Sequence, residues 1–178
     1  MDEHMVWIDL EMTGLDIESC SIIEIATVIT DGDLNIIATG PNLAIKTSEE
    51  DLAAMDEWNT THHNASGLVA RIRKSEYSIA DAEVETLEFI RKYVAEGKAP
   101  LCGNSIWCDR KFIEQQMPEL AAYLHYRMVD VSSFKEMAKR WYPTLPRYEK
   151  KGAHLALDDI LESIEELRYF REKIFIQD

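Results

Sequence analysis

The chain has 178 residues, 46% of them hydrophobic, and its 33 acidic against 19 basic residues give a net charge of −14. This length supports one hydrophobic core, so we expect a single domain over residues 1–178. No apolar run approaches the roughly 20 residues of a membrane span, and the first residues lack the basic and apolar regions of a signal peptide. We therefore expect a cytoplasmic protein with no membrane partner.

The acidic balance also bears on possible partners. A net charge of −14 repels long polyanions, so a nucleic-acid partner would be short and long duplexes are not expected. Acidity that only keeps the protein soluble is an equally good explanation. The three cysteines are odd in number and lack C-x-x-C spacing, which indicates reduced, mostly buried thiols rather than disulfides or a zinc site.

The first part of the chain predicts three antiparallel strands. Met5–Leu10 is a short apolar run with β-branched and aromatic residues, which is typical of a buried strand. Ser21–Thr30 is also rich in β-branched residues, and Asp31-Gly32-Asp33 predicts a hairpin turn into a strand over Leu34–Ile45.

In the second part of the chain, helical patterns alternate with short strand patterns. Such an order predicts an α/β fold with a mixed sheet covered by helices. The apolar spacing from Ile79 to Val94, with Gly97 as a stop, is the clearest helix. The other expected elements are a strand over Pro100–Gly103, a helix over Trp107–Met117, a strand over Arg127–Asp130, a helix capped by Ser132 and running to Trp141, an exposed loop over Tyr142–Lys151, and a helix from about Leu155 to Glu172.

Two carboxylates stand at the end of the first predicted strand. Residues i and i+2 of a strand point to the same face, so Asp9 and Glu11 can reach one metal ion. Hard oxygen ligands suit magnesium or manganese. A solvated strand edge is the simpler explanation of the pair alone, but the apolar run before it predicts a central strand, where ionised carboxylates need a partner charge.

Two further segments carry candidate polar groups. Asp109 lies in the first turns of a predicted helix that follows a Gly-rich strand exit, where a structural cap is the alternative explanation. His154 precedes Asp158 and Asp159. On a regular helix Asp158 would share the face of His154, whereas a His154 in the loop before the helix would leave Asp159 free to point inward. The spacing leaves both aspartates open.

Together, four carboxylates and one histidine match what a two-metal phosphodiesterase requires. Two divalent cations activate water and stabilise the leaving oxygen, while a histidine with a near-neutral pKa accepts the proton of the water. The sequence therefore predicts metal-dependent phosphodiester hydrolysis.

These three segments resemble the DEDD superfamily of 3′-to-5′ exonucleases, in the branch whose third motif is His, four residues, then Asp. The resemblance implies Asp9, Glu11, Asp109 and Asp159 as metal ligands and His154 as general base, and so favours Asp159 over Asp158. Nearly the whole chain is similar to the oligoribonuclease family, on the segments WIDLEMTGLD, MDEWNTTHHNASGL, LCGNSIWCDRKFI, YRMVDVSSFKEMAKRW and HLALDDILESIEELRYFRE.

What the resemblance implies is a ribonuclease H-like fold, a homodimer, two Mg²⁺ or Mn²⁺ ions, and hydrolysis of very short single-stranded RNA, down to dinucleotides, to nucleoside 5′-monophosphates. It also implies roles in substrate binding. Leu15 and Trp58 match an apolar pair that stacks on terminal bases, although a core role for Trp58 is the alternative. The remaining matches are His63, whose neighbour His62 leaves the register open, Ser105, Arg127 and Ser132 at the 5′ phosphate, and Tyr126 across the dimer.

Two rival functions remain open from the sequence. A proofreading or RNA-processing exonuclease of the same branch would act on longer chains, and the strong negative charge counts against it. A non-catalytic RNA-binding module would not need His154.

Overall fold

A computed structural model describes residues 3–149 and 155–175 of the chain. Five strands form one mixed sheet in the order β3-β2-β1-β4-β5. β1 pairs antiparallel with β2, β2 pairs antiparallel with β3, and β4 and β5 continue the sheet parallel to β1. The expected α/β fold with a mixed sheet is thus confirmed. The strands are β1 (Met5–Met12), β2 (Ile22–Thr30), β3 (Ile36–Ala44), β4 (Leu101–Gly103) and β5 (Met128–Asp130).

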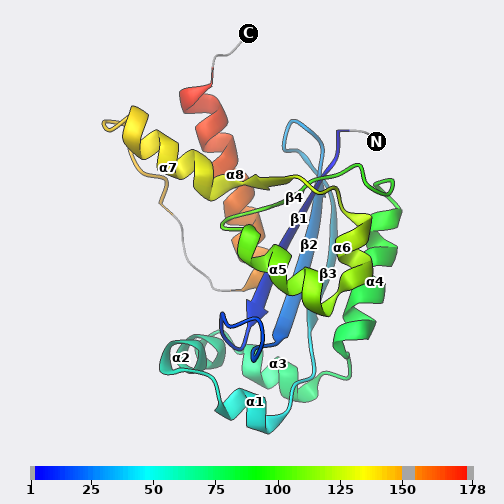
Figure 1. Cartoon of the computed structure of the whole chain (residues 1–178). Coiled ribbons are helices and arrows are strands. Elements are labelled where there is room, and N and C mark those ends of the chain that lie inside the picture. Colours follow the sequence, from blue (N-terminus) through cyan, green and yellow to red (C-terminus); the bar gives the residue numbers. More distant parts are fainter. Residues whose placement is uncertain (1–2, 150–154, 176–178) are drawn as a thin grey trace.

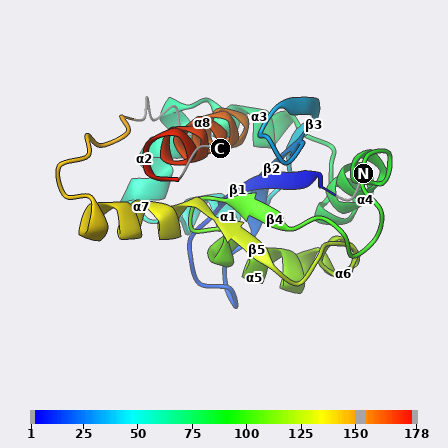
Figure 2. The same ribbon diagram turned by 90° about the horizontal axis from the view of Figure 1, so that it is seen from above.

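Helices cover both faces of this sheet. One core cluster contains Val6 and Ile8 of β1 and residues of α4 (Ile79–Arg91), α5 (Trp107–Gln116) and α6 (Pro118–Tyr123). A second cluster contains Trp7 of β1 and residues of α7 (Val131–Trp141) and α8 (Ala156–Ile174). Successive strand residues point to opposite faces, so the central β1 must be apolar on both. Figure 2 shows α8 on one side of the sheet and α5 and α6 on the other.

Three short helices that the sequence analysis did not predict follow β3. They are α1 (Glu49–Ala53), α2 (Glu57–Ala65) and α3 (Leu68–Lys74), and they lie at the end of the sheet toward which β1 points (Figure 1). Each is less than ten residues long, too short for a clear helical period. Their capping residues, such as Asp56, whose side chain accepts from Asn59 N, were the available signal.

Several predicted boundaries were wrong for local reasons. β3 begins at Ile36 rather than Leu34, because Leu34 is buried with a φ of 68° and cannot continue an extended strand. α4 ends at Arg91, before Val94 and Gly97. The N-cap of α7 is Asp130, which accepts a hydrogen bond from Ser132 N; Ser132 therefore lies inside the first turn.

The other elements agree with expectation within a few residues. α5 ends before Pro118, which starts α6, and no helix or strand covers residues 142–149 of the predicted loop. Residues 150–151 of that loop lie outside the described residues. All three cysteines have free thiols; Cys102 is buried, whereas Cys20 and Cys108 are half-buried. The prediction of mostly buried thiols therefore overestimated the burial of the cysteines. Among the described helices, none has the length and apolarity to cross a membrane.

Candidate active site

Three carboxylates meet where β1 ends. Asp9 and Glu11 share the face of β1 on which Trp7 packs against the α8 cluster, as strand alternation requires. Asp159 lies in the first turn of α8. One oxygen of each of these three carboxylates lies within 4.8 Å of the other two. All three residues are partly buried, so the cluster combines accessibility with a high density of negative charge.

The environment of Glu11 indicates how strongly this charge is concentrated. Burial, and then the nearby charges of Asp159, Glu24 and Asp109, raise the pKa of Glu11 from 4.5 to about 8. A divalent cation would offset this repulsion, and carboxylate oxygens are the ligands that Mg²⁺ and Mn²⁺ prefer. The donor set therefore fits a hard divalent cation.

Asp109 lies beside the cluster without belonging to the group of three. It is buried at the start of α5, and its Oδ1 accepts a hydrogen bond of 3.0 Å from Leu10 N, which ties α5 to β1. Burial raises the pKa of Asp109 to about 7, with Asp130 adding to the rise. Asp109 thus contributes to the negative field around Glu11.

Glu24 is a buried acid at the site that the sequence analysis missed. It lies on β2 directly opposite Glu11, is completely buried, and forms an ion pair with Arg71 of α3. Its Oε2 also accepts from Ala156 N at 3.4 Å, at the start of α8. A single acid in the apolar run SIIEIATVIT was the available signal, because a charge in a buried strand needs a partner.

The start of α8 bears on the choice between Asp158 and Asp159. The helix begins at Ala156, with Leu155 in extended conformation as its N-cap, so helical spacing from residue 154 does not apply. Asp158 is exposed, whereas Asp159 is partly buried and belongs to the carboxylate cluster. His154 lies outside the described residues.

The two apolar side chains proposed for base stacking are exposed. Leu15, in the segment after β1, is 77% exposed, and Trp58 of α2 is 56% exposed. The Trp58 ring stacks on His62 with 3.9 Å between ring centroids. Trp58 is therefore a surface residue and not part of the core.

His62 and His63 have different environments. His63 is buried; its Nε2 donates to the Met12 carbonyl at 3.1 Å, and its Nδ1 lies 3.8 Å from Glu11 Oε2. Burial lowers the pKa of His63, which favours a neutral ring. Of these two histidines, His63 is thus the one whose ring borders Glu11.

The remaining candidate residues, which we call the second group, are two pairs of contacting side chains. Ser105 N donates to Asp130 Oδ1 at 2.9 Å and to Ser132 Oγ at 3.0 Å, and the two serine oxygens are 3.2 Å apart. Tyr126 is 72% exposed, and the guanidinium of Arg127 lies over its ring, 5.4 Å from the centroid. The serines therefore meet between the β4–α5 connection and the start of α7, with Arg127 and Tyr126 exposed before β5.

Comparison with known proteins agrees with this fold. The sequence model of the exonuclease family matches residues 6–167. Exonuclease I from Methylocaldum szegediense superposes with a TM-score of 0.74 at 14% identity, covering 96% of this chain and 41% of that one. E. coli exonuclease I in complex with a dA16 oligonucleotide gives 0.76 at 13% identity over 97% of this chain and 41% of that one. This chain thus spans about two-fifths of their length, and the likeness shows a shared fold.

The fold, the acidic site and the family match define a nuclease of the exonuclease class. Relatives of higher sequence identity are oligoribonucleases. The oligoribonuclease of Hydrogenovibrio crunogenus is 56% identical to this chain over 176 residues, which cover 98% of this chain and 96% of the relative. The Vibrio cholerae protein is 55% identical over 175 residues, with 98% and 97% coverage, and the Acinetobacter baylyi protein 55% over 177 residues, with 99% and 97%. The chain belongs to the oligoribonuclease family.

Proposed function

We propose that this protein is a 3′-to-5′ exoribonuclease, formed by residues 1–178 as one domain, that hydrolyses very short oligoribonucleotides to nucleoside 5′-monophosphates. The observation that carries the proposal is the cluster of Asp9, Glu11 and Asp159 at the end of the central strand. Family membership supports the same activity, because full-length relatives are oligoribonucleases.

The carboxylate cluster, with Asp109 beside it, would hold two divalent cations, Mg²⁺ or Mn²⁺. When bound, these cations would offset the negative charge of the site and stabilise the charge that develops on the attacked phosphate. The chain itself contributes the arrangement of the ligands. β1 presents Asp9 and Glu11 on one face, and the Leu10 N–H holds Asp109 against the same strand.

His154 would act as the general base that takes the proton of the attacking water. In the sequence, His154 precedes the N-cap of α8 and is five residues before Asp159, so one short segment carries both the base and a ligand. A histidine suits this task because its ordinary pKa lies near neutrality.

The exposed apolar side chains would bind the bases. Leu15 and Trp58 offer surfaces that accept any base, and stacking on an aromatic ring contributes roughly 1–3 kcal/mol. His63, buried beside Glu11, would complete the wall of this nucleotide site.

The second group of residues would close on the 5′ end of the substrate. Ser105, Ser132 and Arg127 would form the 5′ phosphate site, since a serine hydroxyl such as that of Ser105 donates to phosphate oxygens and a guanidinium binds them in a bidentate manner. A phosphate site at a fixed distance from the carboxylates would select the shortest chains. Tyr126, which is exposed, would reach across a homodimer, so a fully active monomer in light scattering would contradict that part of the proposal.

The proposal is tested by hydrolysis of 5′-labelled RNAs of two, five and twenty nucleotides with Mg²⁺, with and without chelator. Chelator-sensitive cleavage that is fastest on the dinucleotide is expected, and Asp9→Asn should abolish it. A preference for the twenty-mer would instead support a processing or proofreading exonuclease. Binding without cleavage at any length would support a non-catalytic RNA-binding module.

A further inference from the structure

A chain of polar contacts runs from the exposed Ser105 through partly buried groups into the interior. Asn104, which precedes Ser105, accepts a hydrogen bond from Ser132 Oγ at 3.0 Å through its Oδ1. Its Nδ2 donates to Ser163 Oγ at 2.8 Å and to Glu166 Oε2 at 3.0 Å. One amide therefore connects the serines with α8.

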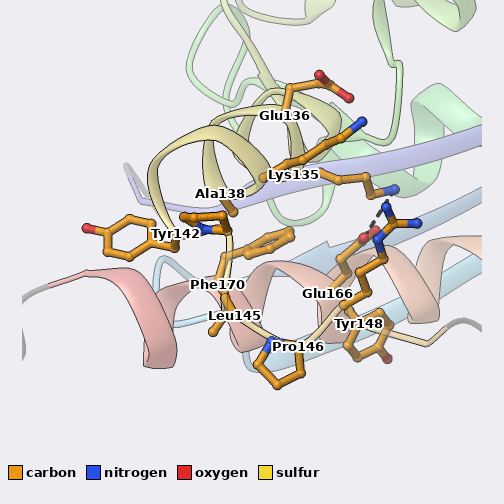
Figure 3. A pocket seen from close by; sticks show the side chains of 12 residues that line it. Lys135, Glu136, Ala138, Tyr142, Leu145, Pro146, Tyr148, Glu166 and Phe170 are labelled. Carbon is orange, nitrogen blue, oxygen red and sulfur yellow. Dashed lines mark ion pairs between the residues drawn. The ribbon is translucent and has the colours of Figure 1, made fainter.

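Glu166 anchors the inner end of this chain. The residue is 1% exposed, although it carries a carboxylate. Its other oxygen, Oε1, lies 3.1 Å from Lys135 Nζ of α7, and both side chains line a pocket between α7 and α8 (Figure 3). Burying a carboxylate costs desolvation energy, and polar partners such as Asn104 Nδ2 and Lys135 Nζ offset that cost.

The partners of Asn104 determine which way its amide faces. Glu166 as a carboxylate only accepts, and Ser163 gives its hydroxyl hydrogen to the Asp159 carbonyl at 2.7 Å, so it also accepts from Asn104. The Asn104 nitrogen must therefore face α8 and its oxygen must face Ser132. With the Ser132 hydrogen given to Asn104, Ser105 is the donor in the contact between the two serine oxygens. A hydroxyl hydrogen rotates to suit its acceptor, so the Ser105 hydroxyl can turn from Ser132 to a phosphate oxygen when a substrate binds.

The backbone of Ser105 depends on the same contacts. Its φ of 50° lies in the left-handed region, which side chains with a Cβ rarely adopt. The hydrogen bonds from Ser105 N to Asp130 and Ser132 oppose this cost. Ser132 is in turn oriented by Asn104.

We propose that Asn104 and Glu166 are positioning residues that hold Ser132, and through it Ser105, so that the Ser105 hydroxyl is placed to donate to a substrate 5′ phosphate. The inference rests on the proposed function, because it concerns the phosphate end of that substrate. Neither side chain needs to touch the phosphate. Glu166 orients the amide, the amide orients Ser132, and Ser132 holds Ser105.

The test uses two substrates, a 5′-phosphorylated diribonucleotide and the same dinucleotide with a 5′ hydroxyl. The preference for the phosphorylated dinucleotide is measured as the ratio of the two kcat/KM values. In Glu166→Gln, an amide replaces the obligatory acceptor, so that Ser163 alone still favours the present orientation of Asn104. We expect the preference for the phosphorylated dinucleotide to fall at least tenfold, chiefly through KM. Glu165→Gln, at the neighbouring exposed position on α8, is the matched control and should keep the preference.

A second pair of variants tests the inference even if Glu166→Gln does not fold. The Lys135 side chain is 46% exposed, so Lys135→Met should fold. It should lower the same preference, and Lys135→Arg should restore it. Equal losses on both dinucleotides, or an unchanged ratio in a folded Glu166→Gln protein, would show a merely structural role and overturn the inference.

Binding separates this inference from the proposed function. Titration calorimetry with chelator present measures the affinity for both dinucleotides without cleavage. A preference for the 5′ phosphate that Glu166→Gln removes would support the positioning role even if hydrolysis failed. A wild-type protein that cleaves both dinucleotides but binds them equally would overturn the inference and leave the exonuclease activity standing.

Discussion

Replacement of Glu11 by Gln should stabilise the metal-free protein at alkaline pH. The pKa of Glu11 is about 8 in the folded protein, against an ordinary value of 4.5 that applies to the unfolded chain. Between these two values the folded state binds more protons than the unfolded state, so the free energy of unfolding falls as pH rises. The carboxylate that would bind metal thus destabilises the fold when no metal is present.

The size of the effect follows from that difference. The folded and unfolded pKa values of Glu11 differ by about 3.5, and each pKa unit corresponds to about 1.36 kcal/mol. The ionised Glu11 therefore lowers the free energy of unfolding by roughly 5 kcal/mol at pH 8 and above. Below pH 4.5 both states are protonated and the penalty disappears. Glu11→Gln, which has no proton to lose, should therefore match the wild type near pH 5 and exceed its stability by several kcal/mol near pH 8.

Urea unfolding in the presence of chelator, at pH values from 5 to 8, measures this difference. Glu85→Gln, at an exposed position of α4, is the matched control and should follow the wild type throughout. Adding Mg²⁺ should stabilise the wild type at pH 8 far more than Glu11→Gln, which lacks one ligand. If Glu11→Gln and the wild type have the same stability at every pH, the reasoning from charge concentration is wrong.

Three further predictions concern single positions. Asp159→Asn should lower kcat at least a hundredfold, because it removes a charged member of the carboxylate cluster. Asp158→Asn, at an exposed position, should keep kcat within about twofold of the wild type, and steady-state hydrolysis of a dinucleotide measures both variants. Trp58→Ala should raise KM roughly tenfold or more by removing a stacking surface of about 1–3 kcal/mol, with little change in thermal stability because Trp58 is 56% exposed. Gly103→Ala should lower the free energy of unfolding by about 1–3 kcal/mol, as measured by urea unfolding. The new Cβ would lie 2.9 Å from Ile106 Cδ1 and 3.3 Å from the Ile8 carbonyl oxygen. An unchanged free energy of unfolding would show that β4 can shift away from β1.

The elements that the sequence predicted well are those whose signal is local. β1 and β2 are long apolar runs, and α4 and α8 repeat their apolar positions over several turns. α1, α2 and α3 are too short for that signal, and the early end of α4 was not visible in a pattern that continued to Val94. Element boundaries depend on turns and caps, such as the left-handed Leu34, that the apolar period does not report.

The same division holds for the site. Asp9 and Glu11 could be paired from the sequence alone, because residues two apart in a strand share a face whatever the rest of the chain does. Only the tertiary structure placed Glu24 opposite Glu11 and Glu166 behind Asn104. Helical spacing left Asp158 and Asp159 open, the resemblance favoured Asp159, and the structure has Asp159 in the cluster. Glu166 is 62 residues from Asn104, and Ala156 is 132 from Glu24. Contacts over such separations arise when sheet and helices pack together, so no local pattern of residues can encode them.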